Sequence, residues 1–265
     1  MSKLATALGE INYTYRKSSN NEPTIVFISG FGGDSTYYNF KSVIDRLPKN
    51  YGFLAIDTIG TGESVSTYME RSTKNILANV LDVIDYEQVN KPITVVGHSL
   101  GGSYAMILAS QNPQKFSSLL LIEPSYSEIR EAILAESGQL QSPELIEDAK
   151  KNGDLREEDL LQSINPNNTE IEKQKNAEIF FRAYGNAMIY EENKLIGNLL
   201  DELKDVEEVL SQTQVRISII ASKKRFDEYN HSKLSLFSQI FAIGEGHYLH
   251  WSHPDFIVQK IIDLQ

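Results

Sequence analysis

Short runs of consecutive apolar residues alternate with amphipathic stretches along the first half of the chain. Four apolar runs stand at residues 24–28, 53–56, 93–96 and 119–122. Uninterrupted apolar runs of this length are typical of strands that are buried on both faces in a parallel sheet. Residues 37–47 and 73–86, which lie between these runs, carry apolar side chains at helical spacing. The alternation predicts an α/β fold, with a mostly parallel, twisted sheet and helices on both of its faces.

The two ends of the chain are expected to complete this sheet. Residues 4–16 alternate in polarity around Gly9, as an antiparallel hairpin at a sheet edge would. Apolar runs return at 215–221 and 239–243, and an amphipathic stretch at 254–264 predicts a closing helix. The sheet should therefore draw its strands from both the start and the end of the chain.

The middle of the chain has a different pattern. Between residues 127 and 212 helical spacing predominates, at about 128–137, 142–152, 170–190 and 199–210. Residues 126–212 also hold 20 Asp and Glu against 9 Lys and Arg, which accounts for the whole formal net charge of −11. We expect residues 126–212 to form a helical cap, inserted after the strand that ends at Glu123. The core would then consist of residues 1–125 and 213–265.

Composition excludes several chemistries and partners. The chain has no cysteine, which rules out disulfides, thiolate zinc sites and a cysteine nucleophile, and which suits a reducing cytoplasm. Its N-terminus lacks a basic flank followed by an apolar segment, and no run approaches membrane-spanning length. The acidic balance disfavours nucleic acid, because phosphate binding requires a basic surface. We expect a cytoplasmic protein that acts on a small molecule, with no nucleic acid or membrane partner; the oligomeric state stays open.

One strand-to-helix junction carries the strongest candidate chemistry. The segment 97–101 reads Gly-His-Ser-Leu-Gly and joins the apolar run at 93–96 to a helical run at 104–109. The chain must turn sharply there, and a glycine on each side of Ser99 relieves the crowding of so tight a turn. Such a turn raises the serine hydroxyl above the carboxyl end of the sheet and leaves the next amide, that of Leu100, free at a helix N-terminus. Ser99 is the predicted nucleophile.

A serine hydroxyl is too weakly acidic to attack unaided, so a serine nucleophile needs a neighbouring base. The chain offers five histidines from which this base could come. His247 follows a predicted strand and two glycines, which allow a loop to swing over the serine. His250 is its main rival. The side chain of His98 should point away from its neighbour Ser99, and His231 lies in a polar helical stretch. We therefore predict His247 as the general base.

Four segments together resemble the α/β-hydrolase superfamily, in particular its capped esterase-like members. They are similar to the family's nucleophile elbow (97–102), oxyanion loop (29–33), loop after the fourth strand (57–64) and terminal histidine turn (246–247). Ser29 stands where relatives often carry histidine, but the oxyanion donor is a backbone amide and should survive this change. The resemblance covers roughly residues 4–125 and 213–265, and the cap carries no matching motif.

The resemblance implies a triad in the order serine, acid, histidine, and it offers two places for the acid. One follows the strand after the elbow, where Glu123 ends the strand and Pro124 forces the chain out of the sheet. The other follows the next core strand, where Arg225 stands at the position at which relatives carry aspartate. Asp227 lies two residues further on. We favour Glu123 as the residue that orients His247, with Asp227 as the alternative.

The same resemblance implies an oxyanion hole made of the backbone amides of Phe31 and Leu100. In the cap, Phe181, Tyr184 and Met188 recur at helical spacing. These three side chains are candidates to line the substrate pocket, although such a stripe is more often simple packing.

Together these residues predict a serine hydrolase that cleaves a small uncharged ester or related acyl compound through an acyl-enzyme, with no metal or organic cofactor. The alternative is a ligand-binding or signalling module of the same fold that turns over slowly. The fold by itself cannot choose the scissile bond, because many chemistries share this constellation.

Overall fold

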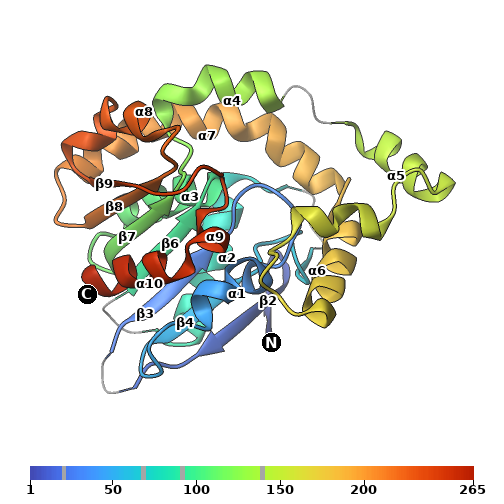
Figure 1. Ribbon diagram of the computed structural model, residues 1–265, viewed down its shortest axis with the longest axis horizontal. Coiled ribbons are helices and arrows are strands. Elements are labelled where there is room, and N and C mark those ends of the chain that lie inside the picture. Colours follow the sequence, from blue (N-terminus) through green and yellow to red (C-terminus); the bar gives the residue numbers. More distant parts are fainter. Residues whose placement is uncertain (20–21, 67–69, 90–92, 138–140) are drawn as a thin grey trace.

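The centre of the molecule is a twisted sheet (Figure 1), seen in a computed structural model that describes residues 1–19, 22–66, 70–89, 93–137 and 141–265. Its strands are β1 (Ser2–Thr6), β2 (Gly9–Arg16), β3 (Thr24–Ile28), β4 (Gly52–Ile56), β5 (Val65–Ser66), β6 (Ile93–His98), β7 (Phe116–Ile122), β8 (Arg216–Ala221) and β9 (Gln239–Ala242). Across the sheet they lie in the order β1-β2-β4-β3-β6-β7-β8-β9, with β5 paired to β2. The strands from β4 across to β9 are parallel, whereas β1, β2 and β5 pair antiparallel at one edge. The α/β fold predicted from the sequence pattern is confirmed.

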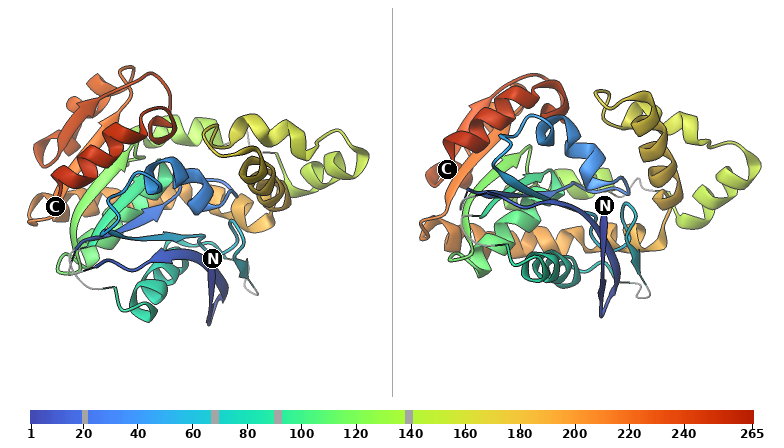
Figure 2. Two further views of the ribbon diagram at one scale, coloured as in Figure 1. Left: turned by 60° about the horizontal axis from the view of Figure 1, so that its bottom comes forward. Right: turned by 90° about the horizontal axis from the view of Figure 1, so that it is seen from below.

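Each face of the sheet carries its own hydrophobic core. One face is covered by α2 (Thr73–Tyr86) and α3 (Leu100–Gln111), and the other by α1 (Thr36–Ile44) and α10 (Pro254–Asp263) (Figure 2). Successive residues of β3 show the division, because Val26 packs in the first core and Phe27 in the second. Helices on both faces are what fully apolar parallel strands require.

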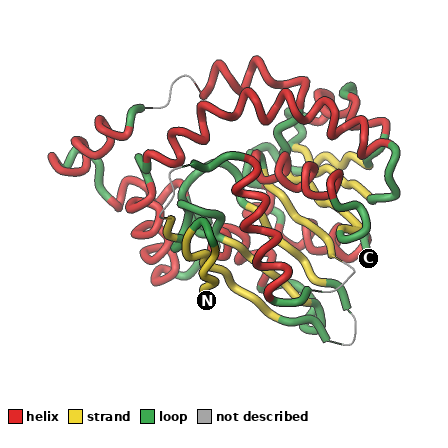
Figure 3. Tube along the Cα trace, turned by 180° about the vertical axis from the view of Figure 1, so that it is seen from behind, coloured by secondary structure: helices red, strands yellow, loops and turns green. Residues whose placement is uncertain are grey.

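The described residues between 127 and 211 form helices that lead away from the sheet and return to it (Figures 1 and 3). They are η1 (Ser127–Ile129), α4 (Arg130–Ser137), α5 (Pro143–Asn152), η2 (Glu157–Ser163), α6 (Glu170–Ala183) and α7 (Ala187–Ser211). The single helix predicted at 170–190 is wrong, because Gly185 adopts φ +80° and Asn186 caps a new helix by accepting a hydrogen bond from the Met188 amide. In the part of the chain that the structure describes, no helix is both long and apolar enough to cross a membrane.

Helix α7 connects the predicted cap to the core. Its residues Leu199 and Leu203 are buried in the same hydrophobic cluster as α3. Nearer its N-terminus, Glu192 forms a buried ion pair with Arg71, Nε to Oε2 2.8 Å, and accepts a hydrogen bond of 2.7 Å from the Tyr104 hydroxyl. The division into core and cap stays a prediction, and core packing extends into the last part of the predicted cap.

The loops at the carboxyl end of the parallel strands are braced by Asp57, which directly follows β4. Its carboxylate accepts hydrogen bonds of 2.8 Å from the Thr36 amide and from Asn12 Nδ2. Burial raises the pKa of Asp57 to about 6, because the surrounding protein disfavours the charged form more than these donors favour it. Asp57 therefore ties the start of α1 to the edge of the sheet that carries the candidate site.

Candidate active site

Ser99 is the turn between β6 and α3. It adopts φ 52° and ψ −122°, a left-handed backbone conformation that non-glycine residues rarely take. The Ser99 amide donates to the Ile122 carbonyl at 2.9 Å, and the Ser99 carbonyl accepts from the amides of Gly102 at 2.9 Å and Ser125 at 3.1 Å. These bonds, to the end of β7, to Ser125 beyond it and to the first turn of α3, hold the strained turn in place. Strain of this kind, fixed by its surroundings, is common at active sites.

The glycines on either side of Ser99 are required by close backbone contacts. A Cβ atom on Gly97 would lie 2.5 Å from the carbonyl oxygen of Gly101. One on Gly101 would lie 2.4 Å from the carbonyl oxygens of Ile28 and Ser29, at the end of β3. The sequence pattern around Ser99 thus has a direct physical cause, because any side chain at these two positions would push the strand, the helix and the neighbouring loop apart.

The loop after β3 lies directly beside Ser99. A Cβ atom on Gly30 would come within 3.0 Å of the Ser99 Cβ, and the next residue, Phe31, lines the same cavity as Ser99. Leu100 is the first residue of α3, so its amide has no acceptor within the helix. The two amides predicted to form the oxyanion hole therefore belong to segments that flank the serine.

His247 and Glu123 lie side by side. His247 Nδ1 is 3.6 Å from Glu123 Oε2, and the Glu123 side chain is only 2% exposed. The Ser222 amide donates to the other carboxylate oxygen, and Arg225 Nη1 donates to Oε2 at 3.1 Å. Burial by itself would raise the pKa of Glu123, but its interactions with His247, Ser222 and Arg225 outweigh burial and hold the pKa below its ordinary value.

The alternative acid is placed elsewhere. Asp227 is an exposed residue of the short helix α8 (Phe226–Asn230), and its backbone carbonyl accepts a hydrogen bond of 2.6 Å from His231 Nδ1. Asp227 is not among the residues that line the cavity at Ser99. Of the two candidate acids, the structure therefore brings Glu123, and not Asp227, to His247.

His98 and His250 form a buried cluster beneath His247. The ring centre of His98 lies 4.5 Å from that of His247 and 4.7 Å from that of His250. Burial, together with the neighbouring histidines, holds the pKa of His98 well below its ordinary value. His98 Nε2 donates to the His247 carbonyl at 3.1 Å, since a carbonyl can only accept. Among the described residues, no group of three or more potential ligands is arranged to hold a metal ion.

The structure also places the two histidines that were set aside as bases. The side chain of His98 was expected to point away from Ser99; its ring packs against His247 and His250, and both His98 and Ser99 are among the residues that line one cavity. His250, the rival base, is fully buried, and its Nε2 donates to Asn39 Oδ1 at 2.6 Å. Burial lowers the pKa of His250 to about 3, so its ring is neutral at ordinary pH. His250 therefore supports the loop of His247 from below and does not reach the cavity.

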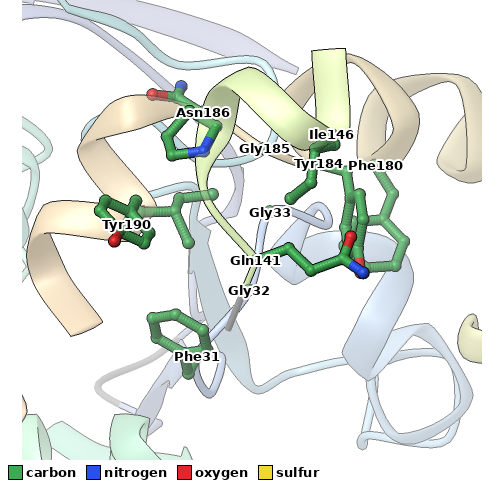
Figure 4. A pocket seen from close by; sticks show the side chains of 12 residues that line it. Phe31, Gly32, Gly33, Gln141, Ile146, Phe180, Tyr184, Gly185, Asn186 and Tyr190 are labelled. Atoms are coloured by element: carbon green, nitrogen blue, oxygen red, sulfur yellow. The ribbon is translucent and has the colours of Figure 1, made fainter. Parts of the chain in front are cut away.

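Two cavities meet at the candidate site. The serine cavity, of about 210 Å³, contains Ser99 and His247 in its wall together with Asp34, Asn39 and Tyr248. The apolar cavity, of about 160 Å³, lies between the loop after β3 and the helices of the predicted cap, and its wall includes Ile146, Tyr184, Ile189 and Tyr190. Figure 4 shows Phe31 and Tyr190 on one side of the apolar cavity and Phe180 and Tyr184 on the other. Phe31, Gly32 and Phe180 line both cavities, which therefore adjoin.

The cap residues predicted to line a pocket fall in three different places. Tyr184 lines the apolar cavity. The Phe181 ring instead lies under Lys150, with Nζ 5.1 Å from the ring centre, and Met188 is buried against Gly60. Phe180, one residue before Phe181, is the ring that faces both cavities. The even spacing of these three residues does not continue in the structure, because the chain breaks at 184–186 and Met188 belongs to the next helix, α7.

Matches to known proteins agree with this architecture. The family model described as alpha/beta hydrolase fold matches residues 23–177, more than half of the chain, and the chain belongs to this family. A putative esterase/lipase of Haemophilus influenzae is 24% identical over 269 residues, which cover 95% of this chain and 86% of that protein. An uncharacterized protein of Mycobacterium tuberculosis is 35% identical over 114 residues, but the match covers 41% of this chain and only 32% of that relative's length.

A solved structure shares the fold over nearly the whole chain. A haloalkane dehalogenase from Agrobacterium tumefaciens superposes with a TM-score of 0.77 at 16% identity, covering 99% of this chain and 95% of that one. At this identity the likeness concerns the fold alone. The matches thus make a hydrolase plausible, and the reaction must be argued from the residues of the site.

Proposed function

We propose that this protein is a serine hydrolase that cleaves a small ester through an acyl-enzyme. The observation that carries the proposal is the presence of Ser99 and His247 on one cavity, with the buried carboxylate of Glu123 3.6 Å from His247 Nδ1. A strained serine, a histidine and a buried acid are the groups that acyl transfer needs. A relative whose sequence matches nearly the whole chain is named a putative esterase/lipase, which supports an ester as substrate.

The proposed reaction assigns one role to each group. Ser99 Oγ attacks the acyl carbon while His247 accepts its proton, and the amides of Phe31 and Leu100 bind the oxyanion. Glu123 holds the imidazole in position and stabilises its protonated form. His247 then donates the proton to the departing alcohol. In the second half of the reaction His247 activates a water molecule, which releases the acid from Ser99.

The two cavities accommodate the two halves of such an ester. The alcohol half must lie beside the histidine that protonates it, which places this half in the serine cavity with His247 and Tyr248. The acyl half then points past Phe31 and Phe180 into the apolar cavity of about 160 Å³. An apolar cavity of about 150 Å³ holds a benzene molecule, so an acyl group of about six carbons fits here.

The test is labelling by a fluorophosphonate probe followed by turnover of 4-nitrophenyl esters. The wild-type protein should label at Ser99 and hydrolyse short-chain esters, and Ser99→Ala should lose labelling and at least about 1,000-fold in kcat/KM. Ser163→Ala removes another serine hydroxyl from the wall of the same cavity and serves as the matched control. Absence of label at Ser99 in the wild-type protein would contradict the proposal.

One observation favours the second candidate, a ligand-binding or signalling module with slow turnover. Within the described residues, no hydrogen bond joins the Ser99 hydroxyl to His247, although such bonds often form only when a substrate is present. Burst kinetics separate the two functions. A rapid burst followed by steady release of 4-nitrophenol supports the hydrolase, whereas ligand binding without a steady rate supports the module.

A further inference from the structure

Asp34 lines the serine cavity but has no part in the proposed reaction. It follows the glycine turn at 29–33, and Asn39 Nδ2 donates to its Oδ2 at 2.6 Å. Asn39 is itself held by His250, whose Nε2 donates to Asn39 Oδ1 at 2.6 Å. Because His250 fixes the amide of Asn39 with its NH₂ group toward Asp34, the carboxylate is held at a defined place in the cavity wall.

The carboxylate of Asp34 has no cationic partner in the part of the chain that the structure describes. Among the described residues that line the serine cavity there is no lysine or arginine, and within the described chain Asp34 belongs to no ion pair. Burial raises the pKa of Asp34 to about 6, so the group is ionised at neutral pH. Asp34 is partly exposed to the cavity, and a carboxylate that is partly withdrawn from water and lacks a counter-ion attracts a cationic ligand, which would offset the cost of its desolvation.

Aromatic rings surround the same space. Tyr248 lines the cavity, and its ring is stacked on Trp251 with the ring centres 3.8 Å apart and the planes within 9°, which fixes its orientation. Phe31 and Phe180 line the cavity as well. Aromatic faces together with a carboxylate form the usual environment of a quaternary or protonated amine, because the ring quadrupoles attract cations.

We propose that Asp34, with Tyr248, forms a subsite for an ammonium group on the alcohol half of the substrate. The inference rests on the proposed function, since the alcohol half is the part that must lie beside His247. It replaces the prediction of an uncharged substrate by that of an ester with a cationic alcohol half, and it disfavours an anionic substrate, which would face Asp34 with no cation in the cavity wall to bind it. The acidic segment 126–212, with its net charge of −11, would also raise the concentration of cations near the site.

A pair of esters of equal shape tests the subsite. Butyrylcholine and 3,3-dimethylbutyl butyrate differ only in a positively charged nitrogen against a neutral carbon, and each reacts with one water molecule to give butyric acid and the alcohol. The wild-type protein should hydrolyse the cationic ester with a kcat/KM about tenfold higher. Asp34→Asn keeps an oxygen for Asn39 but removes the charge, and should bring the ratio of the two kcat/KM values to about one, mainly by lowering kcat/KM for the cationic ester.

A control variant separates the local contact from the general field of the protein. Glu245 is an exposed carboxylate two residues before His247, and it does not line the cavity. Glu245→Gln removes the same charge as Asp34→Asn, and it should leave the preference for the cationic ester within about twofold of wild type, since exposed charges are well screened. An equal loss of preference in both variants would overturn the subsite.

The outcomes distinguish this inference from the proposed function. Steady hydrolysis of both esters at equal rates would overturn the subsite and leave the hydrolase intact. If neither ester is turned over and Ser99 does not label, the hydrolase fails, and the subsite is tested alone by calorimetry. Choline should then bind to Ser99→Ala more tightly than 3,3-dimethylbutanol, and Asp34→Asn should abolish the difference; equal binding of the two alcohols would overturn the subsite.

Discussion

Arg225 Nη1 donates a hydrogen bond of 3.1 Å to Glu123 Oε2, the same oxygen that lies 3.6 Å from His247 Nδ1. The loop after β8 therefore places a cation, Arg225, beside Glu123 and His247. Arg225 stands at the position where relatives in the α/β-hydrolase family carry an aspartate. Two carboxylates so close together would repel each other, and one of them would bind a proton. With a guanidinium in place of the second acid, Glu123 remains ionised. The Ser222 amide binds one of its carboxylate oxygens and Arg225 binds the other.

This arrangement predicts a large loss of activity on substitution of Glu123 and almost none on substitution of Asp227. Glu123→Gln should lower kcat/KM for a 4-nitrophenyl ester by about 1,000-fold or more, because a neutral amide neither orients nor stabilises the imidazolium. Asp227→Asn removes an exposed carboxylate outside the cavity and should change kcat/KM by less than about twofold. Loss of activity in Asp227→Asn with retention in Glu123→Gln would reverse the assignment.

Replacing Arg225 should lower the stability of the fold and shift the pH dependence of the reaction. The Arg225 side chain is 23% exposed, so Arg225→Met should lower the free energy of unfolding by only about 1–2 kcal/mol at neutral pH, measured by urea denaturation. The acid limb of the kcat/KM profile should move to higher pH, because Glu123 then protonates more readily. Arg156→Met, at an exposed ion pair with Glu158, is the control and should change neither quantity measurably.

The loss of stability in Arg225→Met should depend on pH in a defined direction. The pKa of Glu123 is held below its ordinary value in the folded protein, so its ionised form stabilises the fold above that ordinary value. This stability is lost as the pH falls through the lower, folded pKa. The difference between wild type and Arg225→Met should therefore be full at neutral pH and should vanish in acid; a difference that grows in acid would contradict the role of Arg225.

The parts of the site that could be predicted from sequence are those with a local cause. The contacts of Gly97 and Gly101 with neighbouring backbone arise within a few residues of Ser99, or at the adjacent strand end, and so leave a recognisable pattern. The α/β fold could be predicted for the same reason, because burial on both faces makes each parallel strand apolar throughout. The break between α6 and α7 was missed, although Gly185 and Asn186 are ordinary signals for the end and start of helices.

The remaining residues of the site depend on which segments meet in space. Asp34, Asn39 and Tyr248 gather at the serine cavity only because β3 lies beside β6 and the chain after β9 returns over Ser99. The one local signal was the place of Asp34, directly after the glycine turn at 29–33. The cluster of His98 with His247 and His250 has no local signal either, because it forms only where the loop after β9 packs on the end of β6.

The buried ion pair between Arg71 and Glu192 should hold α7 against the core. Both side chains are 3% exposed, so Arg71→Met leaves an uncompensated buried charge and should lower the free energy of unfolding by about 3–5 kcal/mol. Adding Glu192→Leu removes that charge and should restore at least about half of the loss. Lys194→Met, at the exposed pair with Glu191 on the same helix, is the control and should have little effect. A double variant as unstable as Arg71→Met would show that the charge is not the cause.

The apolar cavity should set the length of the acyl group. Ile146 lines it and is 4% exposed, and Ile146→Ala removes three carbons from its wall. The ratio of kcat/KM for octanoyl over hexanoyl 4-nitrophenyl ester should rise about tenfold, because one or two methylene groups that did not fit are then buried. Val206→Ala, a truncation in the main core away from the cavity, should lower stability similarly without changing this ratio. A rise in the ratio would show that the acyl group occupies the apolar cavity, since only the enlarged cavity of this variant favours the longer chain. An unchanged ratio would place the acyl group elsewhere.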